Sequence, residues 1–239
     1  MTDRITNTNA AKLRRATTIA PEISNLHPDI PRAVLPRNNL CHKIGDTNVI
    51  TLETIDYTDQ NGVARKWDMA TRKGKMSDID IADAVIVIPL LRNSGSQKVD
   101  TLLVEQYRPP VGKDTMEFPA GLIKKGESPE DAAMRRIREE TGYVGKDCTI
   151  MPGHDVSRTL CMSPGLTNET VHCVLVDVDL DDPANQGGLK QDLKDGEYTI
   201  VKRVELREGL NKVLEEGDNM PYAGLYMFSL GLETGLGMG

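Results

Sequence analysis

Long hydrophobic runs are absent from this sequence of 239 residues. The longest apolar stretch, residues 84–91, is far shorter than the roughly 20 residues that a membrane-spanning helix needs. Hydrophobic residues make up 38% of the chain and charged residues 27%, which is typical of a soluble globular protein. We therefore expect no association with a membrane.

An excess of positive charge is also missing, because the formal net charge is −7. Surfaces that bind nucleic acid usually carry clustered lysine and arginine side chains. The charge therefore argues against a nucleic-acid partner. It does not exclude a small nucleotide substrate, since a metal ion and a few arginines can supply a local positive field.

Cysteine is scarce, with only Cys41, Cys148, Cys161 and Cys173. No two of them have the spacing of a metal site or of a redox motif. We interpret them as reduced thiols of an intracellular protein. The expected location is cytoplasmic, with the nucleus left as an alternative.

The N-terminal segment, residues 1–40, is polar and contains several prolines. Its first part carries Arg4, Lys12, Arg14 and Arg15 and resembles a mitochondrial presequence only weakly. We favour a flexible N-terminal arm over a targeting segment.

Alternating and branched apolar residues predict a series of strands after this arm. Glycine-rich turns and capping residues separate them from three expected helices. The expected strands cover residues 49–57, 63–72, 81–91, 99–107, 172–178 and 198–204, and the expected helices cover residues 129–141, 207–215 and 221–232. Residues 235–239 are expected to be loose. Strands followed by a helix, then by more strands and a helix, indicate a mixed α/β sandwich.

The helix at residues 129–141 has clear signals at both ends. Ser128 is the expected N-cap, Pro129 stands at the first helical position, and Asp131 completes a variant of the capping box. Gly142 is the expected stop. On such a helix, positions 136, 139 and 140 share one face, because residues three and four apart are neighbours.

Residues 121–143, GLIKKGESPEDAAMRRIREETGY, place charged residues and glycines at a characteristic spacing. The segment resembles the Nudix box, a loop and helix that hold magnesium against a pyrophosphate. The resemblance implies that Glu139, Glu140 and the carbonyl of Ala120 bind Mg²⁺, with Mn²⁺ as an alternative. It also implies that Glu127 is structural and pairs with Arg135.

One position departs from the family pattern, because Arg136 stands where the box has a glutamate. Magnesium prefers carboxylate oxygens, and arginine cannot lose its charge. The Arg136 side chain should therefore either turn out to solvent or occupy the place of a metal ion. We expect metal affinity to fall in both cases.

Three further motifs resemble the ADP-sugar diphosphatase (ADP-ribose pyrophosphatase) branch of the family. They are QYRPP at residues 106–110, EFPAG at residues 117–121 and SPGLTNE at residues 163–169. The resemblance implies a Nudix α/β/α sandwich with a mixed sheet and an N-terminal β-rich extension. It assigns residues 1–40 to the arm, 41–80 to N-terminal strands and 81–234 to the hydrolase domain, and it implies a homodimer.

The same resemblance implies residues for binding a nucleotide-sugar substrate. Arg72 and Arg108 would hold phosphate or adenine edges, because arginine offers a planar fork of donors. Trp67 would stack on adenine and Asp68 would accept from the adenine amino group, although Trp67 could instead be a core or interface residue. A second stacking tryptophan is missing. Further substrate contacts are expected at Glu117, Leu122 and Ser163.

Residues 181–196 form a long polar stretch without strand or helix signals. A structureless loop of this length is usually functional. The resemblance implies a lid, followed by Glu197 as the residue that assists the attacking water. A flexible surface loop is the alternative.

The expected activity is magnesium-dependent hydrolysis of ADP-ribose, or of a related ADP-sugar, to AMP and a sugar phosphate. The expected catalytic residues are Glu139, Glu140 and Glu197. Two alternatives stay open. The first is a nucleotide-sugar-binding protein without turnover, which Arg136 and the missing tryptophan favour. The second is a Nudix hydrolase for another diphosphate, such as a dinucleotide or a CoA derivative.

Overall fold

The computed structural model of the chain describes residues 41–75, 82–149, 156–194 and 196–237. The expected arm, residues 1–40, lies outside them. The described residues form two compact units, one of residues 41–45 and 52–68 and one of residues 46–51 and 69–237. Within these ranges, no helix is both long and apolar enough to cross a membrane.

A three-stranded sheet, with the order β1-β2-β3, contains most of the first unit. Its strands are β1 (Cys41–Asp46), β2 (Ile50–Thr58) and β3 (Ala64–Arg72). Between β2 and β3 the Asp59 carboxylate accepts hydrogen bonds from the backbone of Asn61 and Val63, and Gly62 has a φ of 78°. These contacts form a turn between the two strands, in which a positive φ favours glycine.

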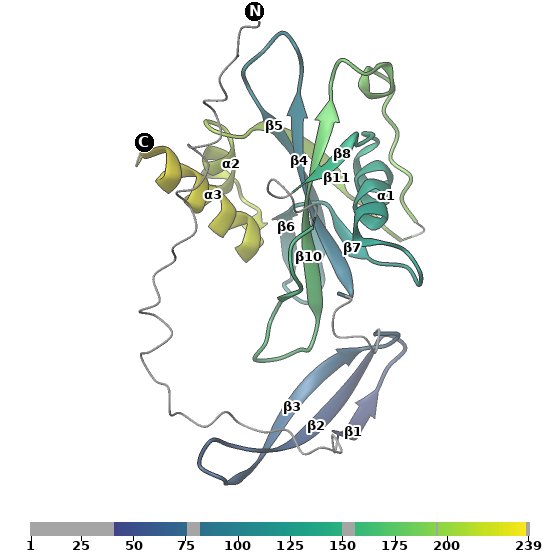
Figure 1. Ribbon diagram of the computed structural model, residues 1–239, viewed down its shortest axis with the longest axis vertical. Coiled ribbons are helices and arrows are strands. Elements are labelled where there is room, and N and C mark those ends of the chain that lie inside the picture. Colours follow the sequence, from purple (N-terminus) through teal and green to yellow (C-terminus); the bar gives the residue numbers. More distant parts are fainter. Residues whose placement is uncertain (1–40, 76–81, 150–155, 195, 238–239) are drawn as a thin grey trace, which may run out of the picture. The chain divides into compact units, whose positions relative to one another are not determined.

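A nine-stranded mixed sheet forms the centre of the second unit (Figure 1). Its main path runs β12-β6-β5-β4-β10-β8, while β11 pairs with β5, β7 with β4 and β9 with β10. The strands are β4 (Ala84–Arg92), β5 (Asp100–Arg108), β6 (Lys113–Glu117), β7 (Ala120–Leu122), β8 (Asp147–Thr149), β9 (Leu160–Cys161), β10 (Thr170–Asp179), β11 (Ile200–Glu205) and β12 (Met220–Pro221). The pair β4–β10 is parallel, whereas β5 pairs with β6 and β11 antiparallel.

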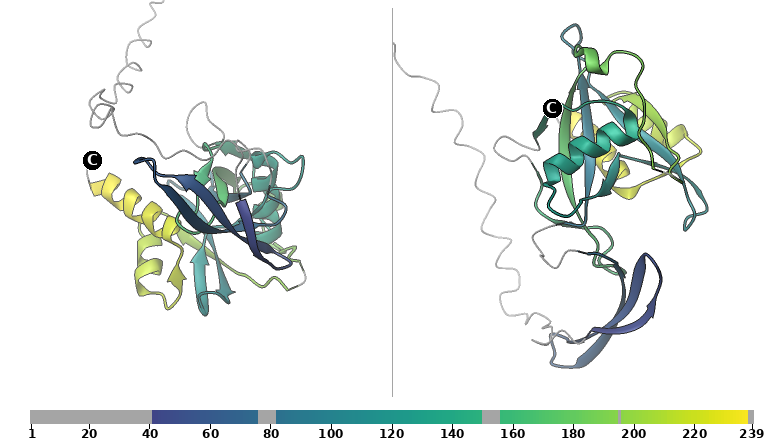
Figure 2. Two further views of the ribbon diagram at one scale, coloured as in Figure 1. Left: turned by 90° about the horizontal axis from the view of Figure 1, so that it is seen from below. Right: turned by 90° about the vertical axis from the view of Figure 1, so that its right-hand side faces the viewer.

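Helices cover both faces of this sheet (Figure 1, Figure 2). Side chains of β4 alternate between two clusters: Val85 and Val87 pack with α1 (Pro129–Thr141), whereas Ile88 and Leu90 pack with α2 (Leu210–Glu216) and α3 (Ala223–Gly237). This alternation follows from the period of two in a strand. The expected α/β/α sandwich with a mixed sheet is therefore confirmed.

Helix α1 has the expected bounds and caps. The Ser128 hydroxyl accepts from the backbone N–H of Asp131 at 3.1 Å and donates to the Asp131 carboxylate at 2.9 Å. Gly142 ends the helix with a φ of 79°, and its N–H donates to the carbonyl of Arg138. A side chain at Gly142 would also come within 2.8 Å of the Lys190 backbone. The helix therefore ends where a distant loop approaches it closely.

The structure corrects the sequence analysis at three places. Helix α3 continues through Gly237, although residues 235–239 were expected to be loose. Residues Met220–Pro221, where that helix was expected to begin, form the edge strand β12 on β6 instead. The loop at residues 181–196 contains the short helix η2 (Pro183–Asn185), in which Asp182 caps the N–H of Ala184. Strand β12 depends on pairing with the distant strand β6, which local patterns do not encode, whereas the cap of η2 is a local contact.

Candidate active site

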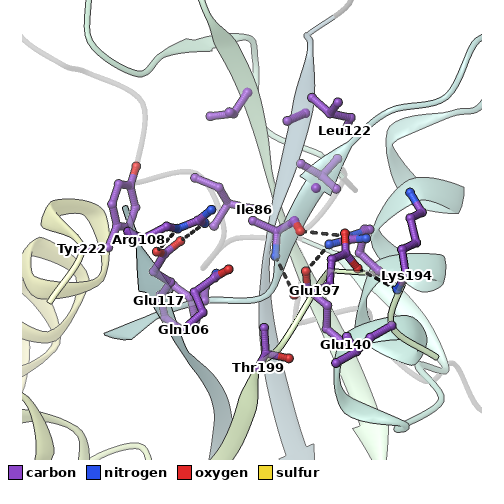
Figure 3. A pocket seen from close by; sticks show the side chains of 18 of the residues that line it. Ile86, Gln106, Arg108, Glu117, Leu122, Glu140, Lys194, Glu197, Thr199 and Tyr222 are labelled. Atoms are coloured by element: carbon purple, nitrogen blue, oxygen red, sulfur yellow. Dashed lines mark hydrogen bonds and ion pairs between the residues drawn. The ribbon is translucent and has the colours of Figure 1, made fainter. Parts of the chain in front are cut away.

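A cavity of about 1250 Å³ opens in the second unit. Its lining comes from β4, β5, β6, β7, α1 and the segment before β11. Figure 3 shows Arg108, Glu117 and Tyr222 on one side of it and Glu140, Lys194 and Glu197 on the other. The size suits a ligand as large as a nucleotide sugar.

Arg108 and Glu117 form a two-point ion pair in the cavity. Arg108 donates through Nε and Nη2 to the two Glu117 oxygens at 2.8 and 2.7 Å, and the Thr115 hydroxyl donates to Glu117 at 2.6 Å. Burial opposes ionisation of Glu117, yet the bonds from Arg108 and Thr115 hold its pKa below the ordinary value. The carboxylate thus orients one face of the guanidinium and leaves its other N–H groups for a ligand.

A second arginine–glutamate pair also belongs to the lining. Arg72 donates to the Glu169 carboxylate through Nε at 3.0 Å and through Nη2 at 2.7 Å. Both residues belong to the second unit and line the cavity. Arg72 and Arg108, the two arginines expected to bind substrate, are therefore each held by a carboxylate.

Arg136 lies inside the site and is only 7% exposed. Its Nε donates to the carbonyl of Ala120 at 2.9 Å and its Nη1 donates to Glu139 at 3.0 Å. Its Nη2 donates to the buried carboxylate of Glu140. The sequence left two positions open for the Arg136 side chain, in solvent or in the place of a metal ion. The structure places it among the expected metal ligands.

Glu140 is 5% exposed and joins α1 to β7. Its second oxygen accepts from the backbone N–H of Ala120 at 3.1 Å, so Arg136 and Glu140 bind the two polar groups of one residue. Burial raises the pKa of Glu140 to about 7, and the negative charge of Glu197 adds to this rise while Arg136 opposes it. Figure 3 shows Glu140 and Glu197 on the same side of the cavity.

The expected magnesium ligands do not fit an ion as they stand. Ala120, Glu139 and Glu140 all bind the guanidinium of Arg136, and Glu139 also accepts from Arg135 at 2.9 Å. No group of three or more His, Cys, Asp or Glu side chains suited to one metal occurs in the part of the chain that the structure describes. An ion at this place would have to displace Arg136, so the magnesium site stays a prediction.

The loop that leads to Glu197 is attached to the end of α1. The Asp192 N–H donates to the carbonyl of Glu139 at 2.8 Å, and the Gln191 side chain donates to the carbonyl of Glu140 at 2.7 Å. The Glu197 carboxylate accepts from the backbone N–H of Lys194 at 3.1 Å. The bonds from Asp192 and Gln191 satisfy helix carbonyls that lack partners within the helix. They hold Glu197 at the cavity.

Glu127 pairs with Arg135 at the start of α1, as expected. Arg135 donates to the two Glu127 oxygens at 2.6 and 2.8 Å and to the carbonyl of Leu122 at 3.0 Å. The hydrogen bond from Arg135 lowers the pKa of Glu127 to about 2. The pair therefore connects the glycine-rich loop to the helix.

Replacing Glu127 with glutamine should lower the free energy of unfolding by about 2 kcal/mol at pH 7. The folded pKa lies below the ordinary value of 4.5, so the carboxylate stabilises the fold fully above that value. The stabilisation should be lost as the pH falls through 4.5 toward 2. Urea unfolding of both chains over this range measures it. Glu130→Gln, in the first turn of α1, is the matched control and should change stability by about 0.5 kcal/mol. A Glu127→Gln loss that does not depend on pH would contradict the assignment.

The structure brings most of the expected site residues to one cavity. These are Arg72, Arg108, Glu117, Ala120, Leu122, Glu140 and Glu197. Glu139 instead lines a smaller depression beside the end of α1. The carbonyl of Ser163 accepts from the backbone of Leu166 and Thr167 within a turn outside the cavity lining.

Trp67 and Asp68 belong to the first unit. The Trp67 side chain is 47% exposed, and Asp68 accepts from the Thr54 hydroxyl at 2.6 Å. Their expected roles at the adenine stay predictions.

The cavity also contains residues that the sequence analysis did not single out. Gln106 and Tyr107 lie next to Arg108 in one of the quoted motifs, so their position was a usable signal. Lys194 belongs to the expected lid at residues 181–196, whereas Tyr222 had no such signal, because only tertiary packing brings it here. Burial, together with the charge of Glu117, raises the pKa of Tyr222, whose hydroxyl lies 3.4 Å from the Met162 sulfur.

Known proteins are similar to this chain in fold and in sequence. A crystal structure of an ADP compounds hydrolase superposes with a TM-score of 0.59 and 17% identity, over 87% of this chain and 97% of that chain, which shows the fold alone. An uncharacterized Nudix hydrolase of Schizosaccharomyces pombe is 39% identical over 80% of this chain and 89% of its own length.

Two further relatives carry names for an activity. An ADP-sugar pyrophosphatase of Mus musculus is 42% identical over 59% of this chain and 61% of its own length. An ADP-ribose pyrophosphatase of Saccharomyces cerevisiae is 37% identical over 68% of this chain and 67% of its own length. The family model for the NUDIX domain matches residues 80–217. The chain therefore belongs to the Nudix hydrolase family.

Proposed function

We propose that this protein hydrolyses the diphosphate of ADP-ribose, or of a related ADP-sugar, to AMP and a sugar phosphate. The names of its relatives in mouse and yeast support this substrate class. The observation that carries the proposal is one cavity lined by Arg72, Arg108 and Arg136 together with Glu140 and Glu197. Arginine forks suit phosphate oxygens, and carboxylates can accept the proton of an attacking water.

In the proposed reaction, water attacks one phosphorus and the bond from that phosphorus to the bridging oxygen breaks. Glu197 accepts the proton of the water, and the bridging oxygen leaves with the other phosphate. Glu197 suits this role because it lines the cavity on the same side as Glu140 and accepts from the Lys194 backbone. No step is assigned to magnesium, since its expected ligands bind Arg136.

Glu197→Gln should lower the kcat for AMP release from ADP-ribose by about 100-fold, because the amide cannot accept the proton. The KM should change by less than about threefold, since the side chain keeps its shape. Chromatographic assay of AMP with purified full-length chain measures both constants. Glu216→Gln removes the same charge at an exposed position of α2 outside the cavity lining and should leave both constants unchanged. An unchanged kcat in Glu197→Gln would remove Glu197 from the mechanism.

A second candidate is a nucleotide-sugar-binding protein without turnover. The specific observation in its favour is that Arg136 binds all three groups expected to hold a metal. The same assay separates the two candidates: AMP release by the native chain supports the enzyme, whereas ADP-ribose binding without AMP release supports the binding protein. The expected homodimer is part of the proposal, and light scattering of the purified chain tests it.

A further inference from the structure

We propose that the guanidinium of Arg136 is the built-in cation of this cavity and binds the diphosphate of an ADP-sugar without a divalent metal ion. The inference rests on the part of the proposed function that assigns an ADP-sugar to the cavity. It does not depend on turnover, and binding measurements test it separately from AMP release.

The position of the guanidinium is fixed by the protein. Arg136 is more than nine-tenths buried and donates to Ala120, Glu139 and Glu140. It also lies against Gly121, where an added Cβ would clash with its guanidinium. A side chain held by three partners and by a glycine contact is pre-organised, so little conformational entropy is lost when a ligand binds.

The guanidinium keeps donors for a ligand. An arginine has five N–H groups, and the bonds to the described partners use one each on Nε, Nη1 and Nη2. One N–H on each of Nη1 and Nη2 therefore remains. Arg136 is part of the cavity lining together with Arg108, so these donors can serve a diphosphate there. Two N–H groups of one guanidinium match two oxygens of a phosphate.

The charges around Arg136 favour an anion more than a metal ion. Ion pairs join three basic and three acidic side chains, which sum to a formal charge of zero: Lys124, Arg135, Arg136, Glu127, Glu139 and Glu140. Glu197 lies outside this group and adds one negative charge to the cavity lining. A glutamate at position 136 would make the same group two charges more negative. A divalent cation needs such a negative group, whereas a diphosphate dianion is repelled by it. Arg136 thus makes the site less attractive to a divalent cation, and less repulsive to a diphosphate, than a glutamate at this position would.

Calorimetric titration of the full-length chain tests the inference. The probe is an α,β-methylene analogue of ADP-ribose, which cannot be hydrolysed at the diphosphate. In the native chain the Kd should differ by less than about threefold between EDTA and millimolar magnesium, because Arg136 supplies the charge. The native chain needs no substitution for this test, so it is independent of whether any variant folds.

Two variants extend the test. Arg136→Glu should bind the analogue at least about tenfold more weakly in EDTA and should recover when magnesium is added. Arg138→Glu makes the same change of charge two residues further along α1, at an exposed position outside the cavity lining, and should behave like the native chain. Titration with Mn²⁺ followed by electron paramagnetic resonance should show ion binding in Arg136→Glu and none in the native chain at the same concentrations.

Each outcome has a definite meaning. The inference is established if the native chain binds the analogue equally well with and without magnesium and Arg136→Glu does not bind it in EDTA. Binding by the native chain only with magnesium overturns it and leaves the proposed substrate intact. If the native chain binds the analogue in neither condition, both the ADP-sugar as substrate and the inference are wrong.

Discussion

Arg136→Glu is expected to raise AMP release from ADP-ribose by about three orders of magnitude in millimolar magnesium. The substitution removes the guanidinium that now binds Ala120, Glu139 and Glu140. It also places a third carboxylate on the helix face of residues 139 and 140. A bound divalent ion can contribute several kcal/mol of transition-state stabilisation, and each 1.36 kcal/mol corresponds to a tenfold change in rate.

The rates of the native chain, Arg136→Glu and Arg138→Glu should be measured side by side with and without magnesium. Only Arg136→Glu should gain activity, because Arg138 is exposed and outside the cavity lining. Thermal melts check that the variant folds, and magnesium should raise its melting temperature if the ion binds the folded state. Equal rates in all three chains would show that residue 136 does not limit the reaction.

Glu140→Ala is expected to lower the free energy of unfolding by about 3–5 kcal/mol. The change leaves the buried guanidinium of Arg136 without its most buried partner and the N–H of Ala120 without an acceptor. A buried charge that loses its partner costs more than the pair itself contributed. The effect should therefore exceed that of any exposed ion pair in the chain.

Urea unfolding at pH 7 measures this loss, with the exposed Glu216→Ala as a control that should stay within about 0.5 kcal/mol of the native chain. The double variant Arg136→Met with Glu140→Leu should recover the part of the loss that comes from the unpaired guanidinium, because apolar residues of similar volume often replace a buried pair. The N–H of Ala120 still lacks its acceptor in this variant, so the recovery should be incomplete. A loss below about 1 kcal/mol in Glu140→Ala would mean that Arg136 moves to solvent easily.

Local sequence signals were sufficient for the elements with strong patterns. Helix α1 has the bounds expected from Ser128, Pro129 and Gly142, because capping depends on residues next to the helix. The central strand β4 was expected because a run of apolar residues is typical of a strand covered on both faces. The pairing of Glu127 with Arg135 was also expected, and both belong to the same loop and helix.

Other features depend on contacts between distant segments. Strand β12 exists only because Met220 and Pro221 pair with β6, and a segment that short has no pattern of its own. Lys194 and Tyr222 reach the cavity through packing, while the expected substrate residue Ser163 lies in a turn outside it. The attachment of residues 191 and 192 to the end of α1 likewise needed the folded chain.

Arg136 shows most clearly what the sequence determines and what only the tertiary structure determines. The sequence by itself determined the family, the helix and the face on which residues 136, 139 and 140 lie, because these depend on spacing along one helix. It left the direction of the Arg136 side chain open between solvent and the metal position. Only the tertiary structure decided it, because the Ala120 carbonyl and the Gly121 backbone that receive the guanidinium belong to strand β7. The protein thus holds a fixed guanidinium among the groups that the family pattern assigns to a metal ion.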